Sequence, residues 1–319
     1  MIKMNKKKID ISSVTLYIGA VVILIIFVIL CAMQGKSFLT VSNTTNIIVQ
    51  STVVGVTAIG ASLVILTGGI DLSIGSIVGL TGIMAGVFIK GGMPIVLALL
   101  ICLVVNGAIG YATGVLVSYG KIPAFIVTLG TMQILRGVTK IITEGQPVSG
   151  LPTELASITT ANIAGIPLMV FYLFILYGIM CFVLKKTKYG RRVYALGGNA
   201  KAAKLSGVKI NQVESITYML ASIFSTIAGI LLLSRLVYAD PNAGTGYEMN
   251  AIAAAVLGGI AMSGGKGNIL NTLVGAIILG MLTCGLQILN VATYYQTIII
   301  GVVIIVAVFF DKVKERKGE

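Results

Sequence analysis

Residues 66–76 read LTGGIDLSIGS and join two long apolar stretches of the chain. Gly68 and Gly69 weaken a helix, because glycine loses more backbone freedom on ordering than any other residue. Asp71 adds a carboxylate, which costs roughly 2.5–3.5 kcal/mol at the centre of a bilayer on insertion scales. The segment therefore predicts an interrupted helix whose polar backbone faces protein or water.

Asp71 has two explanations. In the first, the turn lies near a membrane surface and Asp71 caps the helix that follows. In the second, the interruption lies deeper, and Asp71 and Ser73 border a water-filled translocation path, as ionisable groups inside membranes tend to do. The depth of the turn in the bilayer decides between them, and the sequence leaves both open.

The composition is that of a membrane protein. Hydrophobic residues make up 57% of the 319 positions and charged residues only 10%, which exceeds the apolar share of a soluble domain. The chain has no histidine, the commonest metal ligand and general base. Its four cysteines lie inside apolar runs, which disfavours disulfides and zinc sites. We expect no metal site.

Ten apolar runs are long enough, or nearly so, to cross a hydrocarbon layer about 30 Å thick as helices. The first run follows several lysines but exceeds the apolar core of a secretory signal and lacks a cleavage site, so we predict that it is retained. The fold class is therefore an all-α integral membrane protein with about ten transmembrane helices. The runs cover residues 13–33, 46–66, 72–89, 94–117, 123–142, 167–184, 213–235, 249–263, 268–289 and 294–310.

With the N-terminus inside, ten spans place 18 of the 23 basic residues on the inner side. Cytoplasmic segments carry an excess of Lys and Arg, so we predict that both termini are cytoplasmic. The same placement accounts for the net charge of +13 without a nucleic-acid partner. Three of the other basic residues, Arg136, Lys140 and Arg235, lie near outer helix ends, where long side chains can snorkel to the interface.

The chain is predicted to be one transmembrane domain, residues 1–319. Its parts outside the spans are a cytoplasmic basic tail at 1–12, an outer loop at 143–166, an inner loop at 185–212 and a cytoplasmic tail at 311–319. The outer segments are mildly acidic. They are either an ordinary solvated surface or a docking surface for an external partner.

The inner loop reads KKTKYGRRVYALGGNAKAAKLSGVKINQ and is much longer than a minimal connection. Asn199 is a good N-cap, the residues after it favour helix, and Gly207 supplies a left-handed stop. We therefore predict a helix of about two turns between two glycine breaks, Gly197-Gly198 and Gly207. Because so short a helix is unstable alone, it rests on the membrane surface or on a partner protein.

Five blocks of the sequence resemble the permease subunits of bacterial ATP-binding-cassette (ABC) importers for simple sugars, with the ribose permeases as the nearest likeness. The resemblance runs from about residue 40 to 311. It implies a permease that pairs with a second copy of itself in the bacterial cytoplasmic membrane, among membrane lipid. An ATPase subunit inside and an extracellular or periplasmic sugar-binding protein outside complete the implied importer. The blocks are LVILTGGIDLSIGS (63–76), PAFIVTLGTMQILRGVT (123–139), YALGGNAKAAKLSGVKI (194–210), AGTGYEMNAIAAAVLGGIAMSGGKGNILNTLVGAIILG (243–280) and YYQTIIIGVVIIVAVFFD (294–311).

The resemblance implies that the short inner helix is a coupling helix, located between spans 6 and 7, which contacts the ATPase. In the outer segments Gln146, Tyr247 and Glu248 are candidates for contact with the binding protein or the sugar. The implied coupling residues are Gly197, Gly198, Asn199, Ala200, Lys201, Ala202, Ala203, Lys204, Leu205, Ser206 and Gly207.

The chain lacks a phosphate-binding loop of its own. The motif G-x-x-x-x-G-K-[ST] finds only Gly265-Lys266, where Gly267 replaces the hydroxyl residue and Ile260 the first glycine. We expect that this chain binds no cofactor and that ATP and Mg²⁺ are used by the partner subunit.

Residues 68–75 and 258–265 match at five of eight positions, with Ala261 where the first block has Asp71. This hints at an internal repeat. Ten spans put both blocks on the inner side, whereas an inverted repeat places equivalent turns on opposite sides. The sequence leaves open whether the repeat is a true one.

Two other function classes fit the sequence less well. A secondary transporter or facilitator needs ion-coupling groups inside the membrane, and only Asp71 is available for that role. A membrane enzyme is disfavoured, because the chain offers neither paired intramembrane carboxylates nor a nucleophile with a base. A transport subunit with no catalytic residue is therefore expected.

Overall fold

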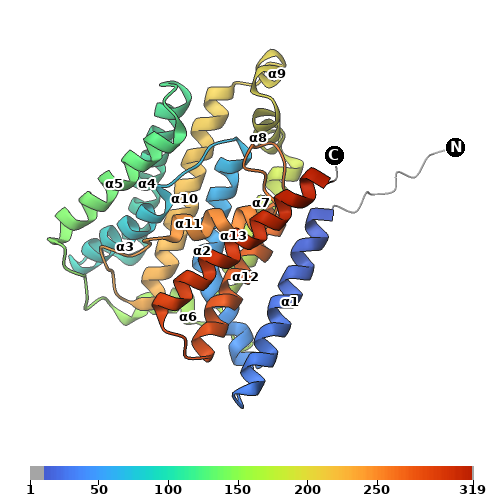
Figure 1. The fold of residues 1–319 in the computed structure, drawn as a ribbon. Helices are drawn as coiled ribbons and strands as arrows, with labels where there is room; N and C mark the ends of the chain where they lie inside the picture. Colours follow the sequence, from blue (N-terminus) through green and yellow to red (C-terminus); the bar gives the residue numbers. More distant parts are fainter. Residues whose placement is uncertain (1–10, 318–319) are drawn as a thin grey trace.

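The computed structural model describes residues 11–317, and most of them are helical (Figure 1). The longer helices are α1 (Ile11–Met33), α2 (Val41–Leu66), α3 (Ile74–Lys90), α4 (Ile95–Ser118), α5 (Ala124–Thr143), α7 (Leu168–Lys186), α10 (Ile210–Leu236), α11 (Tyr247–Leu257), α12 (Ile269–Ile288) and α13 (Thr293–Lys317). The connections contain η1 (Thr153–Ala156), α6 (Ser157–Thr160), β1 (Asn162–Ile163), β2 (Ile166–Pro167), α8 (Lys188–Gly198) and α9 (Ala200–Leu205).

The apolar helices make the chain a multi-pass membrane protein. Seven of those described, α1, α2, α4, α5, α7, α10 and α12, are long and apolar enough to cross a membrane. The other three predicted runs coincide with α3, α11 and the apolar part of α13, which are shorter. Each predicted run thus corresponds to a helix, while the number of crossings stays a prediction.

One predicted boundary is wrong. The run 249–263 contains only part of a helix, because α11 ends at Leu257 and residues 258–268 form an irregular segment. Apolar residues continue past Leu257, so the pattern alone hides the end. Gly259, with φ +78°, provides the left-handed residue that stops the helix.

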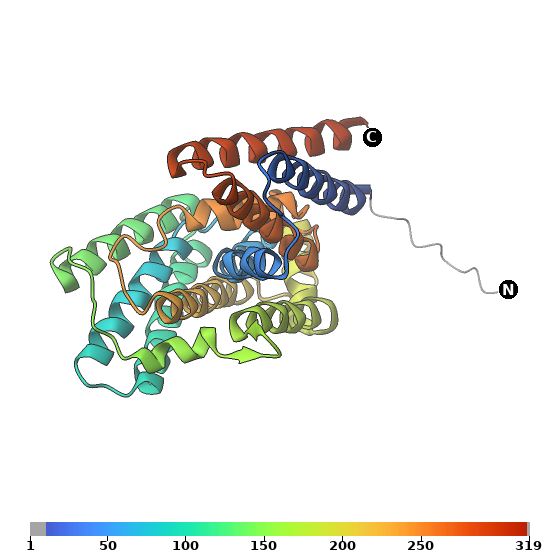
Figure 2. The ribbon, with the colours of Figure 1, turned by 90° about the horizontal axis from the view of Figure 1, so that it is seen from below.

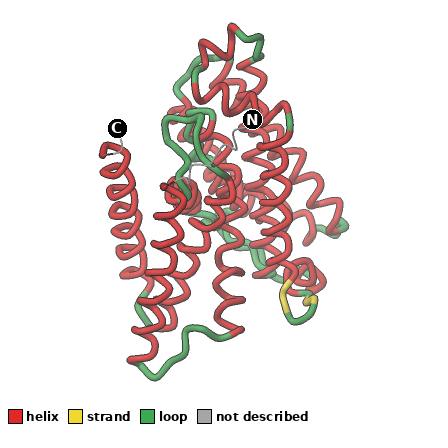
Figure 3. Tube along the Cα trace, turned by 90° about the vertical axis from the view of Figure 1, so that its right-hand side faces the viewer, coloured by secondary structure: helices red, strands yellow, loops and turns green. Residues whose placement is uncertain are grey.

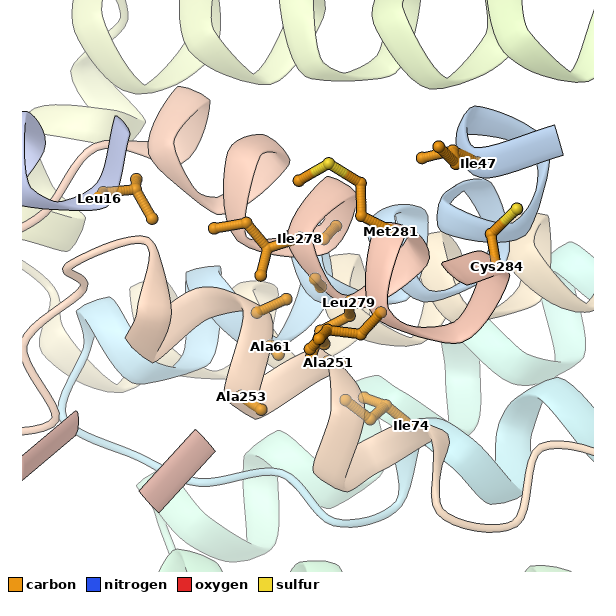
Figure 4. Packing of buried hydrophobic residues seen from close by; sticks show 14 of the residues in the cluster. Leu16, Ile47, Ala61, Ile74, Ala251, Ala253, Ile278, Leu279, Met281 and Cys284 are labelled. Atoms are coloured by element: carbon orange, nitrogen blue, oxygen red, sulfur yellow. The ribbon is translucent and has the colours of Figure 1, made fainter. Parts of the chain in front are cut away.

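Helix α2 occupies the middle of the bundle (Figure 2), where it contacts α7, α10, α11 and α12. Small residues permit this close packing, as is usual between helices in membranes. A side chain at Gly60 would lie 2.8 Å from the carbonyl oxygen of Ala221 on α10. Helix α12 packs on the other side of α2. Figure 4 shows Ile278 and Met281 of α12 in one apolar cluster with Leu16 of α1, Ile47 of α2 and Ala251 of α11.

Helix α9 and the hairpin β1–β2 lie at opposite ends of the bundle (Figures 1 and 3). We call these the α9 end and the α6 end. At the α6 end the predicted outer loop 143–166 holds η1, α6 and the hairpin, and Val148 pairs with Ala239 as an isolated antiparallel bridge.

The predicted tails are only partly described. Residues 1–10 of the basic tail 1–12 lie outside the described residues. Of the tail 311–319, residues 311–317 continue α13. The location of this tail in the cytoplasm stays a prediction.

Candidate functional site

The inner loop folds into two helices, α8 and α9. The predicted cap is present, because Asn199 Oδ1 accepts a hydrogen bond from the Ala202 N–H at 3.0 Å. The predicted stop is present as well, since Gly207 has φ +82°. The predicted break at Gly197-Gly198 is wrong in detail, because both glycines belong to the last turn of α8.

Helix α8 was missed by the sequence analysis, although a signal was available. Thr187 caps it by accepting a hydrogen bond from the Gly190 N–H at 3.3 Å. Tyr189, Val193 and Leu196 follow at helical spacing, and the latter two are buried. A threonine cap followed by apolar residues three and four positions apart is a recognisable helix start.

Two tyrosines attach α8 to the bundle. The Tyr189 hydroxyl is 2.9 Å from Thr217 Oγ1 on α10. Burial raises the pKa of Tyr189 to about 12, against a smaller lowering from that hydrogen bond, so the phenol stays neutral at physiological pH. The Tyr194 hydroxyl donates to the Gly267 carbonyl at 2.9 Å. These two bonds connect α8 to α10 and to the segment 258–268.

The glycines of α8 contact both helix interruptions. A side chain at Gly197 would collide with the Leu66 carbonyl and the Gly265 N–H, and one at Gly265 would collide with the backbone of Gly198. We call Gly68, Gly197, Gly198, Gly264 and Gly265 the glycine junction. Gly197 thus allows α8 to approach both backbones closely, which explains a glycine at this position inside a helix.

The two interruptions, 67–73 and 258–268, lie against each other, because the Gly265 N–H donates to the Leu66 carbonyl at 3.0 Å. This agrees with the expectation that both blocks lie on one side. Each preceding helix ends in the same way. At the end of α2, the Gly68 N–H donates to the Ile65 carbonyl and the Gly69 N–H donates to the Val64 carbonyl. Two such hydrogen bonds, together with a glycine in the left-handed conformation, form the Schellman motif.

At the end of α11, the Gly259 N–H donates to the Val256 carbonyl and the Ile260 N–H donates to the Ala255 carbonyl. The structural equivalents are therefore Gly68 and Gly259, whereas the sequence match aligned Gly68 with Gly258. The two blocks therefore share residues because each contains a glycine helix cap of the same type. In the structure the two caps align one position away from the sequence match. Whether the halves form a true repeat stays open.

Asp71 and Ser73 are both buried before the start of α3. Asp71 Oδ1 accepts hydrogen bonds from the Ser73 N–H at 2.8 Å and from the Ser73 hydroxyl at 2.6 Å. These bonds form an Asx turn ahead of α3, whose N-cap residue is Ser73 and which has no side-chain capping bond. The turn therefore does not decide between the two explanations of Asp71. The part of Asp71 and Ser73 in a translocation path stays a prediction.

The hydroxyl group of Tyr218 on α10 lies beside the first interruption, residues 67–73. A side chain at Gly69 would lie 2.6 Å from its hydroxyl. The hydroxyl is buried and has no hydrogen-bond partner among the described residues. Sequence reasoning missed this contact, because nothing in the local pattern of α10 indicates it.

The outer candidates do not form one cluster. Gln146 is exposed after α5, and Tyr247 is half-buried at the start of α11. Glu248 is only 7% exposed; its Oε1 accepts from the Gly246 N–H at 3.1 Å, and its Oε2 has no partner among the described residues. A side chain at Gly75 of α3 would collide with Oε2. Glu248 therefore faces α3, inside the protein.

Arg136 differs from the snorkelling expectation. Its guanidinium donates to the Ala243 carbonyl and interacts electrostatically with Glu248. The side chain therefore turns inward from α5 to the segment before α11. The sequence around Arg136 does not distinguish a side chain that turns into the protein from one that snorkels to the membrane interface.

A basic cavity of ≈940 Å³ opens beside α9. Lys121, Lys201, Lys204 and Lys209 line it, and the first interruption contributes residues 67–69. Lys121 donates to Asn211 Oδ1 of α10 at 3.0 Å. Helix α9 itself exposes Leu205 at 90% and rests on the bundle through the buried Ala203. The α9 end thus presents a positively charged surface directly beside the glycine junction.

Comparison with known proteins gives consistent matches. A family model described as the permease component of the branched-chain amino acid transport system matches residues 43–308. The chain is similar to the ribose import permease protein RbsC of Escherichia coli strain K12, with 42% identity over 300 residues that cover 93% of this chain and 94% of the relative.

Two further relatives extend the picture. RbsC of Bacillus subtilis strain 168 is 40% identical over 312 residues, which cover 97% of each chain. The D-allose transport system permease protein AlsC of Escherichia coli strain K12 is 36% identical over 292 residues, covering 91% of this chain and 90% of the relative. No solved structure matches the chain.

Proposed function

The chain belongs to the family of permease components typified by the branched-chain amino acid transport system, and we propose that it is the membrane-spanning subunit of an ABC importer for a simple sugar. Relatives that align along nearly the whole chain are named for ribose import and D-allose transport. A ribose-like pentose is therefore the favoured substrate. The subunit transports and does not itself catalyse a reaction.

The proposed importer works by alternating access in the bacterial cytoplasmic membrane. The α9 end faces the cytoplasm, where an ABC ATPase uses ATP and Mg²⁺, and this chain binds no cofactor. The α6 end faces a sugar-binding protein, with Gln146 and Tyr247 as candidates for contact with that protein or the sugar. The buried Glu248 faces α3 and is not available to the binding protein in this conformation. A second permease copy completes the path, to which Asp71 and Ser73 contribute.

The contact of α8 with both interruptions carries the mechanism. The ATPase holds α9 at Asn199–Gly207, and the lysines around the basic cavity suit an acidic partner surface. Because Gly197 touches the end of α2 and the segment before α12, displacement of α8 moves both interruptions together. A ligand-driven switch needs contacts that differ between two states, and this junction is where they change.

Deletion of residues 199–207, with the ends joined by a short flexible linker, tests the proposal. The variant is reconstituted in proteoliposomes with the ATPase and the binding protein. We expect ATP-driven ribose uptake to disappear while membrane insertion is retained. Normal coupled uptake by this variant would overturn the mechanism.

The alternative of a secondary transporter receives no support, because the relatives are named as permeases of import or transport systems. It predicts that vesicles containing this chain alone take up sugar on a proton or sodium gradient. We expect no such uptake.

A further inference from the structure

A cavity of ≈480 Å³ lies toward the α6 end, between α2, α10, α11 and α12, with Ile300 of α13 on its border. Its volume falls in the range of about 300–1,000 Å³ typical of small-molecule sites. It adjoins the first turn of α11, a short helix that ends in the second interruption. Substrate sites of transporters are often built at such discontinuous helices.

Hydrogen-bonding side chains from all four helices line this cavity. The hydroxyls of Ser51 and Thr283 donate to their own helices. The other such side chains are Gln50 of α2, Arg235 of α10, Tyr247 and Asn250 of α11 and Gln287 of α12. The cavity of ≈600 Å³ between α3, α4 and α5 contrasts with it, because its lining is apolar apart from two threonines. Polar side chains in membrane helices are costly unless they meet protein, water or a ligand.

Several of these groups have hydrogen-bonding capacity left over. Gln50 Nε2 donates to Gln287 Oε1 at 2.8 Å, which orients both amides across the cavity. The Asn250 amide makes no side-chain hydrogen bond within the described part of the chain. The Arg235 guanidinium interacts electrostatically with the Tyr247 hydroxyl. Amide, phenol and guanidinium groups are thus available together.

The geometry points to this cavity as a sugar-binding subsite of the permease, which receives the substrate on the outer side. This inference rests on the proposed function. Neutral amides, a phenol and an arginine both donate to and accept from vicinal hydroxyl groups, and an aromatic ring covers sugar C–H groups. No carboxylate of the described residues lines the cavity, so the ammonium group of an amino acid lacks a charged partner there.

The test uses the complete complex, permease with ATPase and binding protein, in proteoliposomes. With saturating binding protein, Asn250→Ala is expected to lower ribose uptake about fivefold, the factor of one lost hydrogen bond of about 1 kcal/mol. ATP hydrolysis stimulated by the binding protein changes less than twofold, because the variant leaves α9 intact. Thr131→Ala, in the apolar cavity, is the matched control and leaves both rates unchanged.

A binding measurement covers the case in which the variant fails to assemble. Asn250→Cys is labelled from the outer side with a membrane-impermeant thiol reagent, against the parent chain as background. Ribose slows labelling, and leucine does not. Unchanged uptake in Asn250→Ala, or equal labelling with and without ribose, overturns the subsite. Failure of the proposed function is distinguishable, because then the unaltered complex shows no ATP-driven ribose uptake.

Discussion

The backbone N–H of Gly265 donates a hydrogen bond of 3.0 Å to the carbonyl oxygen of Leu66. This bond joins the segment before α12 to the end of α2, which are almost 200 positions apart in the sequence. Gly197 of α8 packs on the same two atoms. One residue of the inner loop therefore contacts both interruptions, and the predictions below test what this arrangement does.

Gly197→Ala and Gly198→Ala form a matched pair. A methyl group at Gly197 collides with the Leu66 carbonyl and the Gly265 N–H, whereas one at Gly198 meets nothing within 4 Å. We expect Gly197→Ala to reduce ATP-driven uptake by at least about tenfold, since overpacking costs about 1–3 kcal/mol. Gly198→Ala is expected to transport normally, because alanine also favours helix. Equal uptake by the two variants would contradict the junction.

Asn199→Ala tests the cap of α9. Loss of the bond to the Ala202 N–H costs about 1 kcal/mol, so amide exchange within α9 is expected to accelerate about fivefold. Asn199→Ser, which keeps a capping oxygen, serves as the control. Exchange at α9 that is unchanged in the alanine variant would show that tertiary contacts alone hold this helix.

Gly69→Ala and Tyr218→Phe test the contact at the first interruption. The added methyl group is expected to lower stability by about 1–3 kcal/mol, because it lies 2.6 Å from the Tyr218 hydroxyl. Tyr218→Phe alone is expected to be neutral or stabilising, since it removes an unpartnered buried hydroxyl. The double variant is expected to recover most of the loss in a thermal unfolding measurement. If the double variant is no more stable than Gly69→Ala, the added methyl group does not destabilise the chain through its contact with the Tyr218 hydroxyl.

Arg136 and Glu248 supply a test of buried charge. Each single neutral variant, Arg136→Met or Glu248→Gln, is expected to destabilise the chain, because it leaves the other group without its charged neighbour. The double variant is expected to lose less than the sum of the two, which a double-mutant cycle on unfolding temperature measures. Strict additivity would mean that the two groups do not interact.

The local features were predictable from the sequence, and the tertiary contacts were not. The cap at Asn199, the stop at Gly207 and the interruption around Asp71 follow from short-range backbone chemistry, and the structure has all three. The helical state of Gly197 and the inward turn of Arg136 depend on segments distant in sequence. Helix α11 ends early because a glycine cap stops it within a continuous apolar run.

The candidate site was predictable to the same extent. The sequence indicated the inner loop and Tyr247, but not that Tyr247 lines a cavity with Arg235, Asn250 and two glutamines. Those residues lie on four helices, and polar residues such as these are ordinary near the ends of membrane helices. Only their convergence in space makes them a candidate site.

The central claim is that driving force enters through α9 from an ATPase on the cytoplasmic side. Lys204→Cys, exposed on α9, tests it in membrane vesicles of known orientation with an impermeant thiol reagent. We expect labelling only from the cytoplasmic side, and protection of the cysteine when the ATPase is bound. Labelling from the external side, or a labelling rate that the ATPase leaves unchanged, would contradict the account.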